Sequence, residues 1–310
     1  MTFGIAVSGP GAGRAAFAAL RAVEAVGRGA IGGFAVFAAI DAEGRLHRAE
    51  TQRGGGATLF GGGGPPPELA RAPLAALMSS GPDRPEPLSR FLPADPAVGL
   101  VTGHRLPHLP GADGRPVNAA ALERVAAGEA GEAAVAAFRA SDPESDAGLV
   151  VMDATGRIAL GNSALVDRRD DAGRALVSDT GSGLTIGLLH NSIHPAGGIA
   201  ALAVAAAIDA VAPADAADLC VALTGCPLVM GPANVLHLDA ARRPERIEVT
   251  NPAWIGPAWE GSAVLRGAEV RIGGAPAGRV VGEPYCHAHD GVVTGGHGGD
   301  AAAVHYVVYG

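Results

Sequence analysis

Apolar positions at the start of the chain change from a strand pattern to a helix pattern across a glycine-rich loop. Residues 2–8 form a short apolar run, residues 9–13 hold three glycines, and residues 14–26 repeat apolar side chains on one face and arginines on the other. Such a 3.6-residue period is typical of an amphipathic helix. The pattern predicts a strand, a loop and a helix that packs on a core.

Two pairs of apolar segments surround turns of similar sequence. Residues 34–40 and 46–51 flank Asp-Ala-Glu-Gly-Arg, and residues 148–152 and 158–160 flank Asp-Ala-Thr-Gly-Arg. Tight turns of this kind join antiparallel strands, because parallel strands need a long crossover. We therefore predict antiparallel sheets whose strands pair with sequence neighbours, with helices between the hairpins.

The remaining pattern adds further strands and helices. Apolar runs predict strands at 98–102 and 183–189 and helices at 118–127, 132–140 and 198–211. Residues 52–97 are rich in glycine and proline, which predicts a long insertion or lid. From residue 213 onward short strand signals alternate with glycine and proline, and we expect this part to complete the sheets.

Composition limits the class of protein. With 48% hydrophobic residues the chain is expected to be globular, as a single domain over residues 1–310. A net charge of −8 without a basic run argues against nucleic-acid binding. Neither a membrane span nor a secretory leader is expected, and three cysteines do not make a disulfide framework, so a cytoplasmic protein is predicted. For a globular cytoplasmic protein of this kind we expect a small-molecule substrate, and the chain can form a homo-oligomer.

The chain contains no lysine. A Schiff-base lysine, a Walker lysine and a Ser-Lys pair are therefore excluded as catalytic groups. The chain can supply a nucleophilic or basic amine only at its amino terminus.

Thr2 is the first candidate for catalysis. If Met1 is removed, Thr2 carries both a hydroxyl nucleophile and an α-amine, whose reference pKa of about 8 suits a general base. An oxyanion would need donors nearby, and Asn191 and the backbone amides of glycine loops are candidates. The plainer interpretation is that a small second residue merely permits removal of methionine.

The glycine loop offers a second interpretation. Gly11-x-Gly13-x-x-Ala16 follows a strand and opens a helix, as a dinucleotide fingerprint does. Asp41, the possible ribose ligand, lies too far along the chain and within a hairpin turn. The alternative is a glycine turn that lets the helix and strand pack closely. Antiparallel first strands would argue against dinucleotide binding.

A third candidate is a metal site near the carboxyl terminus. Cys286, His287 and His289 lie close together, with His297 among glycines. Thiolate and imidazole suit a zinc-like divalent ion, although the spacing matches no standard structural zinc pattern. Polar loops also often hold unligated histidines. No cofactor is required by the catalytic hypothesis.

Several features together resemble one protein family. These are Thr-Phe-x-Ile at residues 2–5, an approximate Val-Gly-x-Val-x-Thr strand at 98–102, a two-piece helix at 122–138 followed by Ser-Asp-Pro, the Asp-Ala-x-Gly-Arg hairpin, and a strand leading to an Asn loop and a long helix. They resemble an uncharacterised bacterial family placed in the N-terminal nucleophile (Ntn) hydrolase superfamily. The resemblance covers about residues 1–8 and 98–211.

The resemblance implies an α+β fold, a four-layer αββα sandwich of two antiparallel sheets between helical layers, with amide-bond hydrolysis as its chemistry. Thr2 matches the amino-terminal residue of the family pattern and Asn191 its Asn loop. One departure concerns Asp146, which stands at about the position of the internal threonine of asparaginase-like members.

Our first hypothesis is thus an Ntn-type amidohydrolase for a small amide, with Thr2 as nucleophile. Arginine suits a carboxylate substrate through paired hydrogen bonds. The second hypothesis is a non-catalytic or metal-binding protein of the same fold, and the third is a dinucleotide-binding protein. Candidate substrate-binding residues of the first are His104, Arg105, His108, His190 and His194.

Overall fold

The computed structural model describes residues 2–211, 219–296 and 301–308. The chain divides into two compact units, Met1–Ala212 (unit 1) and Pro213–Gly310 (unit 2). The sequence predicted a single domain. The difference has a physical reason, because the described apolar residues from Leu219 onward form a core among themselves, and the described residues of unit 1 form separate cores.

The first sheet of unit 1 has six strands in the order β3-β2-β4-β1-β10-β9, and every neighbouring pair is antiparallel. The strands are β1 (Thr2–Ser8), β2 (Ala35–Ile40), β3 (Leu46–Thr51), β4 (Leu74–Ser80), β9 (Ala172–Asp179) and β10 (Leu184–Asn191). β1 therefore lies near the middle of this sheet, between β4 and β10.

The second sheet of unit 1 has four strands in the order β5-β6-β7-β8, again antiparallel throughout. They are β5 (Ala94–Asp95), β6 (Gly99–Arg105), β7 (Ala147–Asp153) and β8 (Ile158–Asn162). Together with the helices, the two sheets confirm the predicted α+β class with antiparallel sheets.

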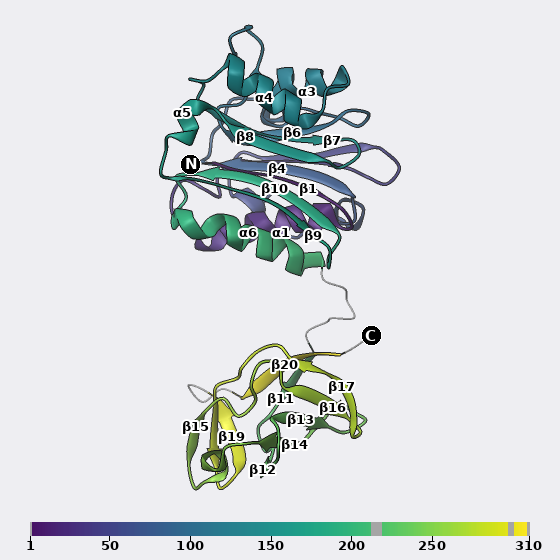
Figure 1. Ribbon diagram of the computed structural model, residues 1–310, viewed down its shortest axis with the longest axis vertical. Helices are drawn as coiled ribbons and strands as arrows, with labels where there is room; N and C mark the ends of the chain where they lie inside the picture. The colour runs from purple at the N-terminus through teal and green to yellow at the C-terminus, as the bar shows by residue number, and fades with distance from the viewer. Residues whose placement is uncertain (1, 212–218, 297–300, 309–310) are drawn as a thin grey trace. The chain divides into compact units, whose positions relative to one another are not determined.

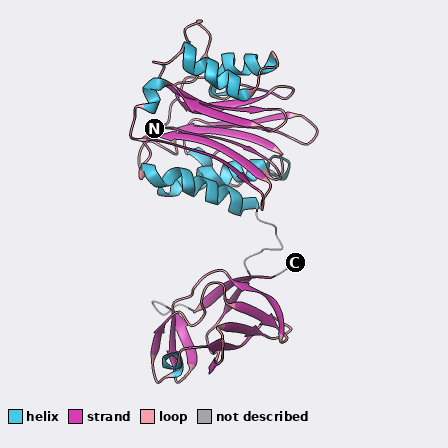
Figure 2. Ribbon diagram, in the orientation of Figure 1, coloured by secondary structure: helices cyan, strands magenta, loops and turns pink. Residues whose placement is uncertain are grey.

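Helices cover the outer faces of the two sheets (Figures 1 and 2). α1 (Ala12–Val26) and α6 (Ala196–Val211) pack on each other and on the six-stranded sheet, whereas α3 (Val117–Ala126) and α4 (Gly131–Ser141) pack on the four-stranded sheet. Two one-turn helices, α2 (Pro67–Ala70) and α5 (Ala164–Asp167), complete the unit together with the short 3-10 turns η1 (Gly55–Ala57) and η2 (Leu88–Phe91). Three apolar clusters lie between the successive layers.

The residues of β1 divide between these clusters by strand period. Phe3, Ile5 and Val7 belong to the cluster beneath α1 and α6, whereas Ala6 belongs to the cluster between the two sheets. Because successive side chains of a strand point to opposite faces, Thr2 projects on the same side as Ala6, toward the second sheet. The period of β1 thus sends Thr2 into the space between the sheets.

The two sheets approach closely where β1 passes β6. A Cβ placed on Gly4 would lie 2.0 Å from the carbonyl oxygen of Gly103. Nearby, Thr102 Oγ1 donates a buried hydrogen bond of 3.1 Å to the carbonyl oxygen of Leu77 on β4. A glycine contact and a hydrogen bond therefore hold the sheets together beside the start of β1.

The glycine loop after β1 serves a turn and a close contact. Gly9 and Gly11 adopt φ angles of 119° and 70°, which glycine reaches without steric cost. A Cβ on Gly13 would lie 1.9 Å from the carbonyl oxygen of Leu69, so the absence of a side chain lets α1 pack against that backbone. Because β1 is antiparallel to both neighbours, these residues do not form the parallel unit that a dinucleotide fingerprint requires.

Residues 52–97 differ from the predicted insertion or lid. They contain β4, all seven residues of which are buried, and this strand pairs with both β1 and β2. Glycine and proline clusters flank β4 on both sides, and they favoured the prediction of a loop. The strand itself, Leu-Ala-Ala-Leu-Met-Ser-Ser, was missed because it shows no alternation of apolar and polar residues. Of this segment, the end of β4, the loop after it and the turn η2 border the cavity described below.

Both predicted Asp-Ala-x-Gly-Arg turns form, with the same hydrogen bonds. Asp41 Oδ1 accepts from the amides of Glu43 and Arg45, and Asp153 Oδ1 accepts from those of Thr155 and Arg157. In each turn the arginine Nε also donates 2.8 Å to the aspartate Oδ2. The local sequence is therefore enough to define these hairpins.

The regular elements described in unit 2 are strands, apart from one 3-10 turn. Its larger sheet has the order β11-β20-β17-β16-β13-β14-β12, in which β12 pairs parallel with β14 and β13 parallel with β16. These strands are β11 (Leu219–Ala222), β12 (Leu228–Met230), β13 (Val235–Leu238), β14 (Pro244–Val249), β16 (Glu269–Ile272), β17 (Ala275–Val280) and β20 (Ala303–Val308). Residues from 213 onward were expected to complete the sheets of the first part, but the strands described in this part of the chain pair only among themselves.

A three-stranded antiparallel sheet accompanies it, in the order β15-β18-β19. Its strands are β15 (Trp259–Gly261), β18 (Cys286–His289) and β19 (Val292–Gly296), and the 3-10 turn η4 (Pro252–Ile255) precedes them. Over the described residues of both units, no helix combines the length and apolar character needed to cross a bilayer.

Candidate functional site

Thr2 stands in one row with two polar residues of neighbouring strands. The registers place Ser80 of β4 and Asn191 of β10 directly opposite it. Directly opposed residues project from the same face of a sheet, so all three side chains lie between the sheets. Thr2 is 4% exposed, and its Oγ1 donates to Ser80 Oγ at 3.4 Å. The register thus brings Thr2 and Asn191, the two predicted catalytic residues, together.

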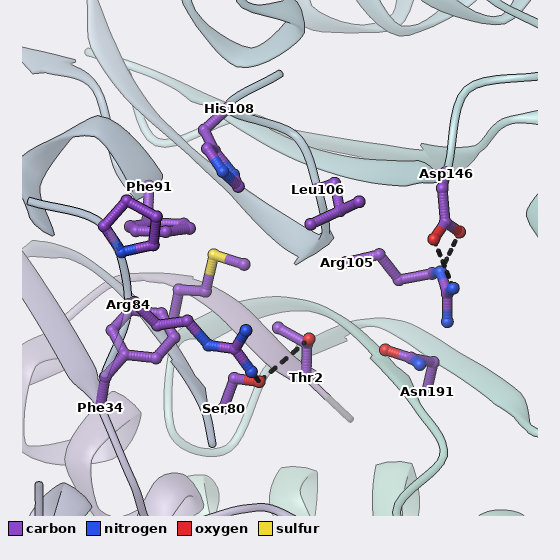
Figure 3. Close-up of a pocket in the computed structure, with 12 residues that line it drawn as sticks. Thr2, Phe34, Ser80, Arg84, Phe91, Arg105, Leu106, His108, Asp146 and Asn191 are labelled. Carbon is purple, nitrogen blue, oxygen red and sulfur yellow. Dashed lines mark hydrogen bonds and ion pairs between the residues drawn. The ribbon is translucent and has the colours of Figure 1, made fainter. Parts of the chain in front are cut away.

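A cavity of about 280 Å³ opens over this row (Figure 3). It lies between the ends of the two sheets and the loop after β4. Its lining comprises Thr2, Phe34, Met78, Ser80, Arg84, Pro85, Phe91, Arg105, Leu106, His108, Asp146 and Asn191. The predicted substrate-binding residues Arg105 and His108 are therefore in the same cavity as Thr2.

Arg105, the last residue of β6, is held by an ion pair. Its Nε and Nη2 donate to the two carboxylate oxygens of Asp146, and both side chains are largely shielded from solvent. Its backbone has a φ of 64°, which costs a non-glycine residue about 1–3 kcal/mol. The fork that was expected to bind a substrate carboxylate is thus already occupied by a carboxylate of the protein.

Asn191 is oriented by a chain of hydrogen bonds from solvent inward. Arg169 donates through Nε and Nη2 to Asp171, at 2.8 and 2.6 Å. Ser192 Oγ donates to Asp171 Oδ2 at 2.5 Å and accepts from Asn191 Nδ2 at 3.0 Å. The Arg169 guanidinium and the Ser192 hydroxyl lower the pKa of Asp171 to about 2, so this carboxylate is ionised at neutral pH.

These hydrogen bonds give the side-chain amide of Asn191 a single orientation. Since the single proton of Ser192 Oγ goes to Asp171, that oxygen can only accept from Asn191 Nδ2. Asn191 Oδ1 therefore points the other way, toward Thr2 (Figure 3). This oxygen is buried and finds no donor in the described part of the chain.

His108 is a neutral wall of the cavity. Its ring lies against Phe91, with 4.2 Å between centroids, and 6% of the residue is exposed. Burial, together with the charges of Arg90 and Arg84, lowers the pKa of His108 to about 4. At neutral pH the ring carries no charge, and it can donate one hydrogen bond and accept one.

The other predicted histidines lie outside the cavity. His104 is fully buried beside it, with Nε2 2.8 Å from Asn162 Oδ1. Burial lowers its pKa to about 4, with Asn162 and Asn191 acting in the opposite direction. His190 is equally buried and neighbours Asn191, so the strand period sends it to the opposite face; burial lowers its pKa to about 4. His194 is exposed.

Three polar or charged residues of the cavity were not foreseen as site residues. Ser80 and Arg84 belong to the segment that was taken for a lid, and Asp146 was noted only as a departure from a family pattern. A serine that ends a buried strand is the one local signal that could have suggested Ser80. Its place beside Thr2 depends on strand register, which the local sequence does not encode.

Within the described part of the chain, the residues predicted to bind a metal do not come together at one point. Strand β18 turns Cys286 into the core of unit 2, while His287 and His289 alternate to the other face. His289 Nδ1 lies 3.0 Å from Asp290 Oδ2, and burial raises the pKa of the Cys286 thiol. His297 lies outside the described residues. Among the described ranges no group of three or more potential ligands occurs.

Comparison with known families divides the chain at nearly the same place as the structure. Residues 225–301, within unit 2, match a second family described as a domain of unknown function (DUF7259). No curated protein matches the chain. Residues 2–219, which include the whole described part of unit 1, match the family described as a domain of unknown function (DUF6963), and the chain belongs to that family.

Proposed function

We propose that unit 1 is an amidohydrolase of the Ntn type, which cleaves an amide bond of a small molecule with Thr2 as its nucleophile. The layers of unit 1 support the proposal, because helices, sheet, sheet and helices follow in the order of an αββα sandwich. The observation that carries it is the position of Thr2. Its hydroxyl lies at the start of a central strand, on the floor of a cavity.

The proposed reaction begins once Thr2 is the amino terminus. Its α-amine then accepts the proton of Oγ1, which attacks the carbonyl carbon of the amide to give a tetrahedral oxyanion. The amine returns the proton to the leaving nitrogen, and the C–N bond breaks to leave an ester on Thr2. Water, deprotonated by the same amine, hydrolyses the ester and restores the hydroxyl.

The row of residues beside Thr2 assigns roles in this scheme. Asn191 Oδ1 is a buried acceptor aimed at Thr2, so it suits the ammonium form of the α-amine rather than the oxyanion. This changes the role expected from the sequence, in which Asn191 would donate to the oxyanion. Ser80 Oγ accepts from Thr2 Oγ1 and so holds the hydroxyl toward one side of the cavity.

The first test is the covalent state of residue 2 in protein isolated from its native host. Amino-terminal sequencing and intact mass should show Thr2 as the first residue. A homogeneous protein in which Thr2 is preceded by methionine or any other residue would end the proposal.

The second test is amine release from a panel of small amides by the mature protein. Thr2→Ala should lower the rate by about a thousandfold or more, because the nucleophile is lost. Thr2→Ser keeps a hydroxyl and should retain measurable hydrolysis. Circular dichroism and thermal unfolding establish that both variants fold, and full activity of folded Thr2→Ala would exclude Thr2 as the nucleophile.

A further inference from the structure

Arg84 is held over the cavity by its own loop. The side-chain amide of Gln52 pairs with the backbone of Arg84, accepting from its N–H at 2.9 Å and donating to its carbonyl at 2.8 Å. The guanidinium then folds back, with Nε donating 3.2 Å to the carbonyl of Gly81 and Nη2 donating 3.1 Å to Ser80 Oγ. Both the backbone and the head group of Arg84 are thus fixed before any ligand arrives.

The charge of Arg84 is not balanced within the described chain. Arg105 is paired with Asp146, and the neighbour of Arg84 in sequence, Asp83, is paired with Arg53. For Arg84 no acidic partner occurs among the described residues. Two of its five N–H groups are used on Gly81 and Ser80. The remaining donors form part of a planar fork, the shape that binds a carboxylate through two hydrogen bonds.

The surroundings of this charge are apolar. Phe34, Met78 and Phe91 also line the cavity, and Figure 3 shows the Arg84 guanidinium beside Ser80, between Phe34 and Thr2. His108 adds no charge at neutral pH, because the pKa of this residue is lowered to about 4. A cation beside apolar walls interacts more strongly with an anion than it would in water.

From this arrangement we propose that Arg84 forms a carboxylate subsite, and that the ligand of the cavity is a small amide bearing a free carboxylate and an apolar side chain. The identity of the cleaved bond rests on the proposed function, whereas the subsite does not. Only the Ser80 hydroxyl separates the guanidinium from Thr2 Oγ1. A carboxylate on Arg84 therefore lies a few bonds from the carbonyl that Thr2 attacks, as in an N-acyl amino acid.

Binding to a catalytically inert protein tests the subsite directly. Calorimetric titration of full-length Thr2→Ala with N-acetyl-L-phenylalanine and with its primary amide compares two probes that differ in the carboxylate. N-acetylglycine and its amide repeat the comparison without the apolar side chain. We expect the acids to bind at least tenfold more tightly than the amides, and the phenylalanine pair more tightly than the glycine pair.

Variants at residue 84 and a matched control locate the effect. Arg84→Gln in the Thr2→Ala protein should remove the preference for the acids while leaving the amides unchanged, and Arg84→Lys, which keeps the charge without the fork, should be intermediate. Arg71→Gln changes the net charge equally at an exposed position and should behave as the parent does. Thermal unfolding confirms that each variant folds.

Each outcome separates the subsite from the hydrolase. Acids that bind no better than amides, acids that fail to bind, or a preference that survives in folded Arg84→Gln would each overturn the subsite, whatever the activity of the mature protein. An Arg84-dependent preference in a protein that hydrolyses none of the amides would support the subsite and count against the proposed function alone.

Discussion

Ser192 Oγ lies 2.5 Å from Asp171 Oδ2 and gives its proton to that carboxylate. The same oxygen accepts from Asn191 Nδ2, so the pair determines which end of the Asn191 amide faces Thr2. The backbone of Ser192 has a φ of 53°, an uncommon conformation for a residue with a side chain. The chain thus accepts local strain at the point where this hydrogen bond forms.

The first prediction concerns this orientation. Asp171→Ala should free the Ser192 proton to be donated to Asn191 Oδ1, which lets the amide reverse. On the proposed mechanism kcat should fall by on the order of tenfold, the value of one hydrogen bond, with little change in KM. The acid limb of the pH–rate profile should move to lower pH, because an acceptor that favoured the ammonium form is lost.

Two further variants distinguish orientation from general damage. Asp171→Asn still offers an oxygen to Ser192 and should restore most of kcat. Arg169→Gln removes the charged partner of Asp171 but keeps the bond to Ser192, and should have only a small effect. Wild-type kcat and an unmoved pH profile in Asp171→Ala would show that Asn191 is not oriented in this way.

The buried histidines predict a loss of stability in mild acid. The pKa values of His104, His108 and His190 are lowered to about 4, chiefly by burial. The unfolded chain takes up protons below about pH 6.5, whereas these three rings in the folded protein stay neutral until about pH 4. The free energy of unfolding should therefore fall as the pH is lowered through this window, by up to about 1.4 kcal/mol per pH unit for each histidine.

Thermal unfolding at pH 7, 6 and 5 measures this fall. His108→Gln removes one of the three groups, so its Tm should decrease less between pH 7 and pH 5 than that of the wild type. His194→Gln, at an exposed position, is the matched control and should follow the wild type. An equal decrease in His108→Gln and the wild type would contradict a neutral, buried His108.

The contact between the sheets predicts a strong effect at Gly4. In Gly4→Ala the new Cβ would meet the carbonyl oxygen of Gly103 at 2.0 Å, so the two backbones must move apart. Overpacking of this kind typically costs 1–3 kcal/mol, which corresponds to a decrease in Tm of several degrees. Because Thr2 is two residues away on the same strand face, the volume of the cavity should change as well.

Gly198→Ala is a control with the same chemical change. Gly198 lies in α6, where a Cβ would meet nothing within 4 Å, and alanine is the better helix former. We expect its Tm to equal or exceed that of the wild type. A Gly4→Ala protein that is as stable as Gly198→Ala would show that the sheets do not meet as closely as described.

Local patterns were sufficient for most elements of unit 1. Hydrophobic period predicts the helices α1 and α6, and turn chemistry predicts the hairpins around Asp41 and Asp153. Both signals act over a few residues. The buried strand β4 was missed, because a fully buried strand shows no alternation and its flanks are rich in glycine and proline. The second unit was missed for a related reason, since short strands carry no signal of which sheet they join.

The sequence by itself determined the chemistry available to this protein. It has a threonine at residue 2, no lysine, and histidines and arginines near apolar strands. Tertiary structure decided which of these groups meet. Strand register placed Ser80 and Asn191 beside Thr2. The fold also paired Arg105 with Asp146, so Arg84 is the arginine of the cavity lining without an acidic partner among the described residues. The turn sets the register within a hairpin, but the register between strands that are far apart in the chain depends on long-range contacts, which no local pattern encodes.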